Sequence, residues 1–200
     1  MPAFDLIIFD CDGVLVDSEP IANAVFAEML GELGWDFSLE EMYEQFVGRS
    51  MATCLDLVAK MRGAPVPKTF AEDYGKRSLQ ALRERVVAIQ GVREVIADLA
   101  TPYCVTSSGD HHKMRTTLGS TDLLDLFEGK MFSATDVARG KPFPDVYLLA
   151  ASRSGVESGV AAGMTVFASA GVVSAQRLVA AGACAVFDDM REPPTPLPQE

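Results

Sequence analysis

The chain has 200 residues and a mass of 21.5 kDa, enough for one buried core with a modest inserted domain. Its formal net charge of −11, with no cluster of basic residues, argues against nucleic acid as a partner. The first residues carry no basic leader and no apolar stretch reaches the roughly 20 residues of a membrane span. We therefore expect a cytoplasmic protein with no membrane partner.

The first predicted element is a strand. Residues 6–9 are a short apolar run rich in β-branched side chains, which is typical of a strand buried on both faces. Apolar residues at helical spacing then predict a helix over about 19–33. Ser18 is its expected N-cap, Pro20 suits its first turn, and Gly34 is expected to end it.

The segment that follows predicts only helices. Ser38 and Glu41 have the spacing of a capping box, which indicates a helix start. A run rich in Gly and Pro at 63–67 interrupts the helical pattern, which resumes over about 70–85. Because no strand is predicted between 18 and 90, this block is expected to be inserted into the surrounding fold.

Strands and helices alternate in the rest of the chain. The expected strands are 103–106, 130–132, 164–167 and 184–187, and the expected helices are about 92–99, 111–118, 145–154 and 174–181. This alternation predicts an α/β fold with a doubly wound parallel sheet, whose ligand site lies at the carboxyl ends of the strands. We expect residues 1–17 and 90–200 to form this core domain and residues 18–89 to form a helical cap domain.

Two carboxylates, Asp10 and Asp12, directly follow the first strand. Such like charges repel unless a cation compensates them, and Mg²⁺ commonly does so at phosphate-handling sites. One carboxylate can then attack phosphorus while the other transfers a proton. The competing interpretation is a strand-end turn with solvated acids. Cys11 between them is one of four widely spaced cysteines without a CxxC pair, which we expect to be reduced, buried thiols.

The context of these acids resembles a known family. Residues 9–19, Phe-Asp-Cys-Asp-Gly-Val-Leu-Val-Asp-Ser-Glu, are similar to the first motif of the haloacid dehalogenase (HAD) superfamily, hhhDxDGhhhDS, and the resemblance runs along almost the whole chain. It implies a HAD-like Rossmannoid core with a helical cap, as in sugar phosphatases, phosphogluconate phosphatases and β-phosphoglucomutase-like members. It further implies that Asp10 is the nucleophile and Asp12 the acid and base, with Mg²⁺ bound by the Asp10 side chain and the Asp12 backbone carbonyl.

Three further segments resemble family motifs. Ser107 matches the second motif and would bind phosphate with Ser108, although a simple helix cap, or Thr106 as the matching residue, is the alternative. Lys141, which precedes a proline, matches the third motif and would stabilise the charge of the nucleophile and the phosphoryl group. Arg49 resembles a cap residue that contacts substrate, and a surface arginine in a turn is the alternative.

The fourth family motif, a strand ending in an acidic pair, is expected after residues 150–156 and before the landmark at 161–164, Ala-Ala-Gly-Met. Only four residues separate these segments, so about a dozen residues are missing there by comparison with the family. Glu157 is the one candidate for a replacement metal ligand. Asp145 belongs to the helix that follows Lys141. The acids at 188–189 resemble a late surface turn of the relatives rather than the acidic pair of the metal site.

These observations predict a Mg²⁺-dependent phosphatase that acts on a small phosphorylated metabolite, a sugar or sugar-acid phosphate, and that is impaired by the missing motif. The alternative from another class is a weak or inactive HAD-fold remnant or binding protein. A phosphomutase is disfavoured, because residues 19–23 lack the histidine that related phosphomutases carry. We expect a monomer.

Overall fold

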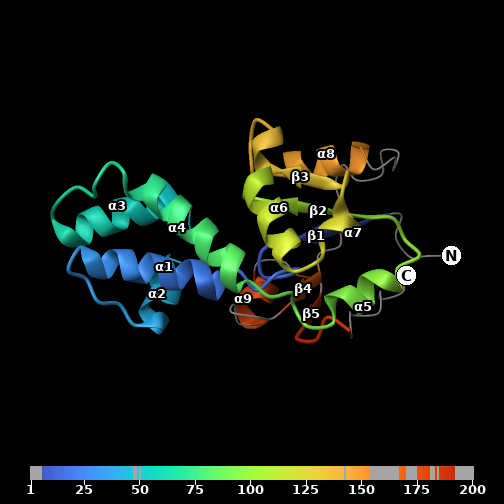
Figure 1. Cartoon of the computed structure of the whole chain (residues 1–200), viewed down its shortest axis with the longest axis horizontal. Helices are drawn as coiled ribbons and strands as arrows, with labels where there is room; N and C mark the ends of the chain where they lie inside the picture. Colours follow the sequence, from blue (N-terminus) through green and yellow to red (C-terminus); the bar gives the residue numbers. More distant parts are fainter. Residues whose placement is uncertain are drawn as a thin grey trace. The chain divides into compact units, whose positions relative to one another are not determined.

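The chain divides into two compact units in a computed structural model that describes residues 6–46, 49, 51–141, 143–153, 167–169, 175–180, 183 and 185–191. Residues Met1–Asp17 and Val87–Glu200 form the first, called the α/β unit below, and Ser18–Val86 form the second, called the helical unit. Figure 1 shows the elements of both. None of the described helices is long and apolar enough to cross a membrane.

The helical unit consists of the helices that the sequence predicts. They are α1 (Glu19–Glu32), α2 (Leu39–Phe46), α3 (Met51–Arg62) and α4 (Phe70–Arg85). Phe26 on α1 is the centre of its core, with ring centroids 5.2 Å from Phe46, 5.8 Å from Phe70 and 5.4 Å from Tyr74, all edge to face. Such pairs add to the free energy gained by burying the rings, so this unit has a core of its own.

The helix ends confirm the predicted capping box and the expected positions of Ser18 and Gly34 at the two ends of α1. The Ser38 hydroxyl accepts a hydrogen bond from the Glu41 N–H at 3.2 Å and the Glu41 carboxylate accepts one from the Ser38 N–H at 2.8 Å, which is a capping box. Gly34 follows α1 with a φ of 85°. Ser18 precedes α1, but its backbone is helical and its side chain makes no cap hydrogen bond. Ser18 therefore occupies the expected N-cap position without the capping hydrogen bond, and its side chain is buried.

The α/β unit has the predicted α/β fold. Its strands pair in parallel throughout, in a three-stranded sheet of order β1-β2-β3 and a two-stranded sheet β4-β5. The strands are β1 (Ile7–Asp10), β2 (Tyr103–Ser107), β3 (Met131–Ser133), β4 (Phe167–Ser169) and β5 (Ala185–Phe187). The helices are α5 (Val92–Ala97), α6 (His111–Ser120), α7 (Leu124–Phe127), α8 (Asp145–Arg153) and α9 (Ala175–Ala180), with a 3-10 helix η1 (Ala134–Asp136).

Some boundaries differ from those expected. Strand β3 spans Met131–Ser133, one residue later than expected, and residues 164–166 of the strand expected over 164–167 lie outside the described residues. Helix α7 and η1 were not predicted, because each is too short to show a period in its apolar residues. The Phe127 ring of α7 is fully buried, edge-on to Phe9 at 6.2 Å and to Tyr103 at 5.5 Å. Tertiary packing, not local pattern, therefore defines α7.

The chain leaves and re-enters the α/β unit through two adjacent segments. The Asp17 N–H donates to the Val87 carbonyl at 2.9 Å, and the Ile89 N–H donates to the Leu15 carbonyl at 3.0 Å. Val16 and Ala88 form an antiparallel bridge between them. These bonds hold residues 15–17 and 87–89 of the α/β unit side by side, where the chain leaves that unit and returns to it.

Candidate active site

Asp10 lies at the carboxyl end of β1 and forms an ion pair with Lys141, 131 residues further along the chain. The Lys141 Nζ atom lies 2.8 Å from Asp10 Oδ1, and it is 3.4 Å from the carbonyl of Thr106 on β2. Burial lowers the pKa of the Lys141 ammonium, but the Asp10 carboxylate, with Tyr147, outweighs burial and raises the pKa overall. Lys141 is therefore a charged partner of Asp10.

The turn after β1 directs both acids to the same edge of the sheet. Gly13 has a φ of 74°, which favours glycine, and its N–H donates to the Val16 carbonyl at 2.9 Å. The Cys11 N–H donates to Asp10 Oδ1 at 2.8 Å. Burial, together with the carboxylate of Asp12, raises the pKa of the Cys11 thiol to about 12, so this residue stays a neutral packing group.

Asp12 is held by two groups from different elements. The Ser107 hydroxyl at the end of β2 lies 3.3 Å from Asp12 Oδ2, and the Lys113 ammonium in the first turn of α6 lies 2.8 Å from Oδ1. The structure thus brings Asp10, Asp12, Ser107 and Lys141 together at one edge of the parallel sheet, where ligand sites of such folds lie.

The loop after β2 distinguishes the two candidates for the second motif. The Ser107 hydroxyl accepts the Gly109 N–H at 2.9 Å, and the Gly109 carbonyl accepts the Ser133 hydroxyl at 2.8 Å. The Thr106 hydroxyl instead lies 3.4 Å from the Phe9 carbonyl, inside the sheet. The geometry therefore favours Ser107 over Thr106 as the hydroxyl that faces the acids.

Lys113 was not identified from the sequence. A lysine in the first turn of a helix is disfavoured by the helix dipole unless an anion faces it. That local anomaly was the available signal, but nothing in the sequence says that Asp12, 101 residues away, is the anion.

The other expected site residues have different surroundings. Ser108 is exposed, and Arg49 is an exposed turn residue of the helical unit. Glu157, the candidate metal ligand, lies outside the described residues, as does the landmark at 161–164. Asp145 forms a bidentate ion pair with Arg139 at 3.0 and 2.8 Å.

Two oxygens remain as candidates for a divalent cation. They are Asp10 Oδ2, on a side chain that is 45% exposed, and the Asp12 backbone carbonyl. Mg²⁺ is commonly bound by one or two carboxylates while it keeps several waters and takes substrate phosphate oxygens. Across the described part of the chain, no group of three or more His, Cys, Asp or Glu side chains could hold a metal ion. These two oxygens alone would leave most of the ligand positions of a Mg²⁺ ion to water and substrate.

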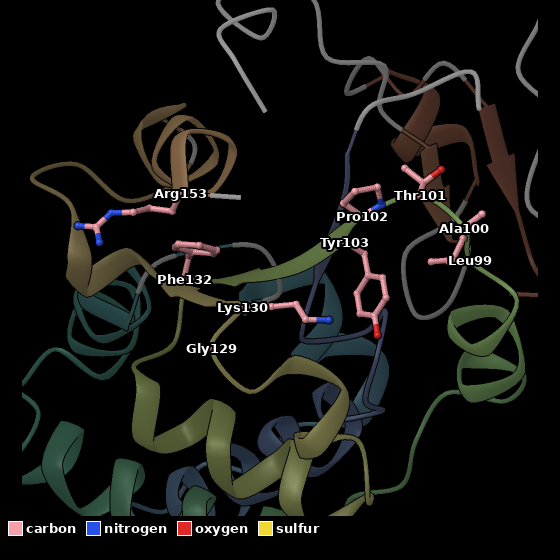
Figure 2. Close-up of a pocket in the computed structure, with 9 residues that line it drawn as sticks. All are labelled: Leu99, Ala100, Thr101, Pro102, Tyr103, Gly129, Lys130, Phe132 and Arg153. Carbon is pink, nitrogen blue, oxygen red and sulfur yellow. The ribbon is translucent and has the colours of Figure 1, made fainter. Parts of the chain in front are cut away.

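A cavity of about 610 Å³ lies at the other end of the sheet (Figure 2). It is lined by the start of β2 and by the residues around β3, including Phe132 and Arg153. The Lys130 ammonium lies 3.9 Å from the centre of the Tyr103 ring, so part of the cavity wall is a cation–π pair. Because Tyr103 begins β2 and Ser107 ends it, this cavity is separate from the two acids.

Known proteins resemble this chain over most of its length. Residues 7–164 match the family of haloacid dehalogenase-like hydrolases. The 6-phosphogluconate phosphatase of Escherichia coli is 32% identical over 183 residues, which cover 84% of this chain and 83% of that protein. The aligned part of this chain, 84% of its 200 residues, is shorter than the 183 positions of the alignment, so the alignment contains gaps on the side of this chain.

Solved structures give the same result. A conserved haloacid dehalogenase-like protein of unknown function from Agrobacterium tumefaciens has a TM-score of 0.85 and 35% identity, covering 95% of this chain and 96% of that one. A HAD family hydrolase from Deinococcus radiodurans, solved with bound phosphate and sodium, has a TM-score of 0.74 and 28% identity, covering 92% and 90%.

Proposed function

We propose that this chain, which belongs to the haloacid dehalogenase-like hydrolase family, acts as a phosphomonoester hydrolase and cleaves a small phosphorylated sugar or sugar acid through an aspartyl-phosphate intermediate. The observation that carries this mechanism is the ion pair between Asp10 Oδ1 and the Lys141 ammonium at 2.8 Å. It leaves Oδ2 of a partly exposed carboxylate available for attack, beside a fixed positive charge.

In the first step Asp10 Oδ2 attacks phosphorus and forms an acyl phosphate, while the bond between phosphorus and the sugar oxygen breaks. Asp12 donates a proton to that leaving oxygen. The Lys141 ammonium lies between the nucleophile and the carbonyl of Thr106, where it stabilises the charge on Asp10 and on the transferring phosphoryl group.

In the second step water attacks phosphorus and Asp12, now a carboxylate, takes its proton. The bond between phosphorus and the Asp10 oxygen breaks, so inorganic phosphate leaves and both acids return to their first state. The backbone N–H groups that follow Ser107 at the start of α6 would hold the phosphoryl oxygens in both steps, together with the Ser107 hydroxyl when its proton turns from Asp12 to the phosphoryl group.

Mg²⁺ would be held by the Asp10 side chain and the Asp12 backbone carbonyl. When bound, it would neutralise phosphoryl oxygen charge and reduce the repulsion between the phosphoryl group and Asp10. Since the sequence lacks the fourth-motif acidic pair of the family, we propose that Mg²⁺ binding and turnover are weaker than in relatives that have it.

The substrate class rests on the relatives. One of them is the 6-phosphogluconate phosphatase of Escherichia coli and another the hexitol phosphatase B of the same organism, 28% identical to this chain. Arg49 in the helical unit supplies a positive charge for a second anionic group, such as a sugar-acid carboxylate, and Ser108 a further donor for the phosphate. A cytoplasmic location and a monomeric state remain predictions.

A catalytically silent binding protein is the second candidate. One observation favours it: both carboxylates already have an ammonium partner at 2.8 Å, so the acidic pair is neutralised without any metal. A phosphomutase has no such support, since the segment after Ser18 lacks the expected histidine.

Hydrolysis of p-nitrophenyl phosphate with Mg²⁺ tests the proposal, followed by a panel of sugar and sugar-acid phosphates. We expect slow turnover that Asp10→Asn abolishes. Asp145→Asn is the matched control, because it makes the same chemical change at the surface ion pair with Arg139. Turnover that survives Asp10→Asn would contradict the mechanism. Fast turnover of the unchanged chain, abolished by Asp10→Asn, would support the mechanism and contradict only the proposal that turnover is weaker than in the relatives. No turnover at all would favour the silent binding protein.

A further inference from the structure

Asp12 is fixed at both of its carboxylate oxygens. The Lys113 ammonium lies 2.8 Å from Oδ1 and the Ser107 hydroxyl 3.3 Å from Oδ2. The Asp12 side chain is only 23% exposed and that of Lys113 33% exposed, so water screens this pair less than the ion pairs at the surface.

The position of Lys113 is itself built by its neighbours. Its backbone N–H donates at 2.7 Å to the carboxylate of Asp110, the N-cap of α6. Its side chain passes over Gly109, where an added Cβ would lie 2.9 Å from Lys113 Cδ and 3.3 Å from Ser107 Oγ. The helix cap therefore fixes the position of the Lys113 backbone. Because Gly109 has no side chain, the Lys113 side chain has room to extend to Asp12.

Lys113 has a different task from Lys141. The nucleophile Asp10 already has its own ammonium partner, and the Lys113 ammonium is bonded to the other acid. An aspartate side chain has several rotamers, and a proton transfer needs one of them. A group that selects this rotamer affects the reaction through Asp12.

We propose that Lys113 is a positioning residue: by binding Oδ1 of Asp12 it holds the carboxyl group in the orientation from which Oδ2, once it carries a proton, protonates the leaving oxygen. The proposal rests on the phosphatase function proposed above and goes beyond it. It predicts that a Lys113 variant affects alkyl and aryl phosphate esters differently, whereas a variant that is merely less stable would affect both equally. A sugar alkoxide is a poor leaving group and needs the proton from Asp12, whereas p-nitrophenolate leaves without one.

Two substrates therefore test the proposal, glycerol 2-phosphate as an alkyl ester and p-nitrophenyl phosphate as an aryl ester. We expect Lys113→Met to lower kcat/KM for the alkyl ester about 10- to 100-fold more than for the aryl ester, since misplacing a catalytic group costs rates of this order. We expect Lys113→Arg, which keeps the charge, to restore part of the loss. Equal losses on both esters would overturn the proposal.

Arg115→Met is the matched control on the same helix. It also removes one positive charge and one ion pair, with Glu128 at 3.0 and 2.9 Å, but at the surface. We expect it to leave the ratio between the two esters unchanged. The double variant with Asp12→Asn should be no slower than Asp12→Asn alone, because Lys113 acts only through Asp12. Additive losses in this cycle would contradict the proposal.

Crystal structures of the full chain with and without Lys113→Met decide the question independently of turnover. We expect the Asp12 carboxylate to leave the Ser107 hydroxyl and adopt another rotamer in the variant. An Asp12 that keeps its place beside Ser107 would overturn the positioning role, even if the wild-type chain were an active phosphatase. If the wild type showed no turnover, the proposed function would fail, but this comparison would still test Lys113.

Discussion

The two aspartates after β1 are each neutralised by a lysine. Asp10 pairs with Lys141 and Asp12 with Lys113, so adjacent like charges do not repel freely in the folded chain. Because the folded state raises the pKa of Lys141, this pair stabilises the fold below the ordinary lysine pKa. The contribution of the Lys141 ammonium is lost as the pH rises through the raised pKa, in alkaline solution.

Ser107 and Thr106 allow a direct test of which hydroxyl serves the site. We expect Ser107→Ala to lower kcat/KM for p-nitrophenyl phosphate about 10- to 100-fold, the value of one hydrogen bond to a charged group. We expect Thr106→Val to change it little, since the Thr106 hydroxyl is directed to the Phe9 carbonyl. Steady-state kinetics of both variants measure this. A larger loss in Thr106→Val would assign the second motif to the other residue.

Short elements bring the site residues together. Strand β1 has four residues and β3 has three, yet the parallel pairing of Asp10 with Thr106, and of Ser107 with Ser133, brings their ends to one edge. Helix α6 then begins directly beyond β2, which puts its first turn beside the acids. The arrangement depends on strand register, because a shift of one residue would turn each side chain to the opposite face.

Helix α2 offers a test of a local prediction. Ser38→Ala removes one half of its capping box, and we expect a loss of about 1 kcal/mol in the free energy of unfolding of the helical unit. Chemical denaturation followed by circular dichroism measures it. Ser152→Ala, on α8 of the α/β unit, removes an exposed helix hydroxyl that donates to the Leu149 carbonyl, and it should leave the free energy of unfolding of the helical unit unchanged. Equal losses would show that the capping box adds nothing.

The chain as a whole combines two units that each have a core. The helical unit packs around Phe26, whereas the α/β unit buries Cys104 and Val105 of β2 completely. Because the site acids and both lysines belong to the α/β unit, the proposed chemistry depends on that unit. The proposed role of the helical unit is to recognise the sugar through Arg49.

Mg²⁺ affinity is a property of the complete chain. We expect calorimetry to give a dissociation constant about 10- to 100-fold higher than for a family relative that has the fourth-motif acidic pair, the usual cost of losing a group that supports a metal site. Asp10→Asn should abolish the binding that remains. An affinity equal to that of the relative would indicate that another acid of this chain binds the metal. The affinity of Glu157→Gln would then show whether that acid is Glu157.

The sequence by itself determined the strand that carries Asp10 and Asp12, the helices of residues 18–86 and the α/β alternation, because these are patterns of neighbouring residues. The likeness of short motifs to a family also identified Ser107 and Lys141. Only the tertiary structure decided that Lys113 meets Asp12 and that Ser107, not Thr106, faces the acids. Contacts between residues about a hundred positions apart depend on strand register and on where a helix begins, and neither leaves a periodic signal in the chain.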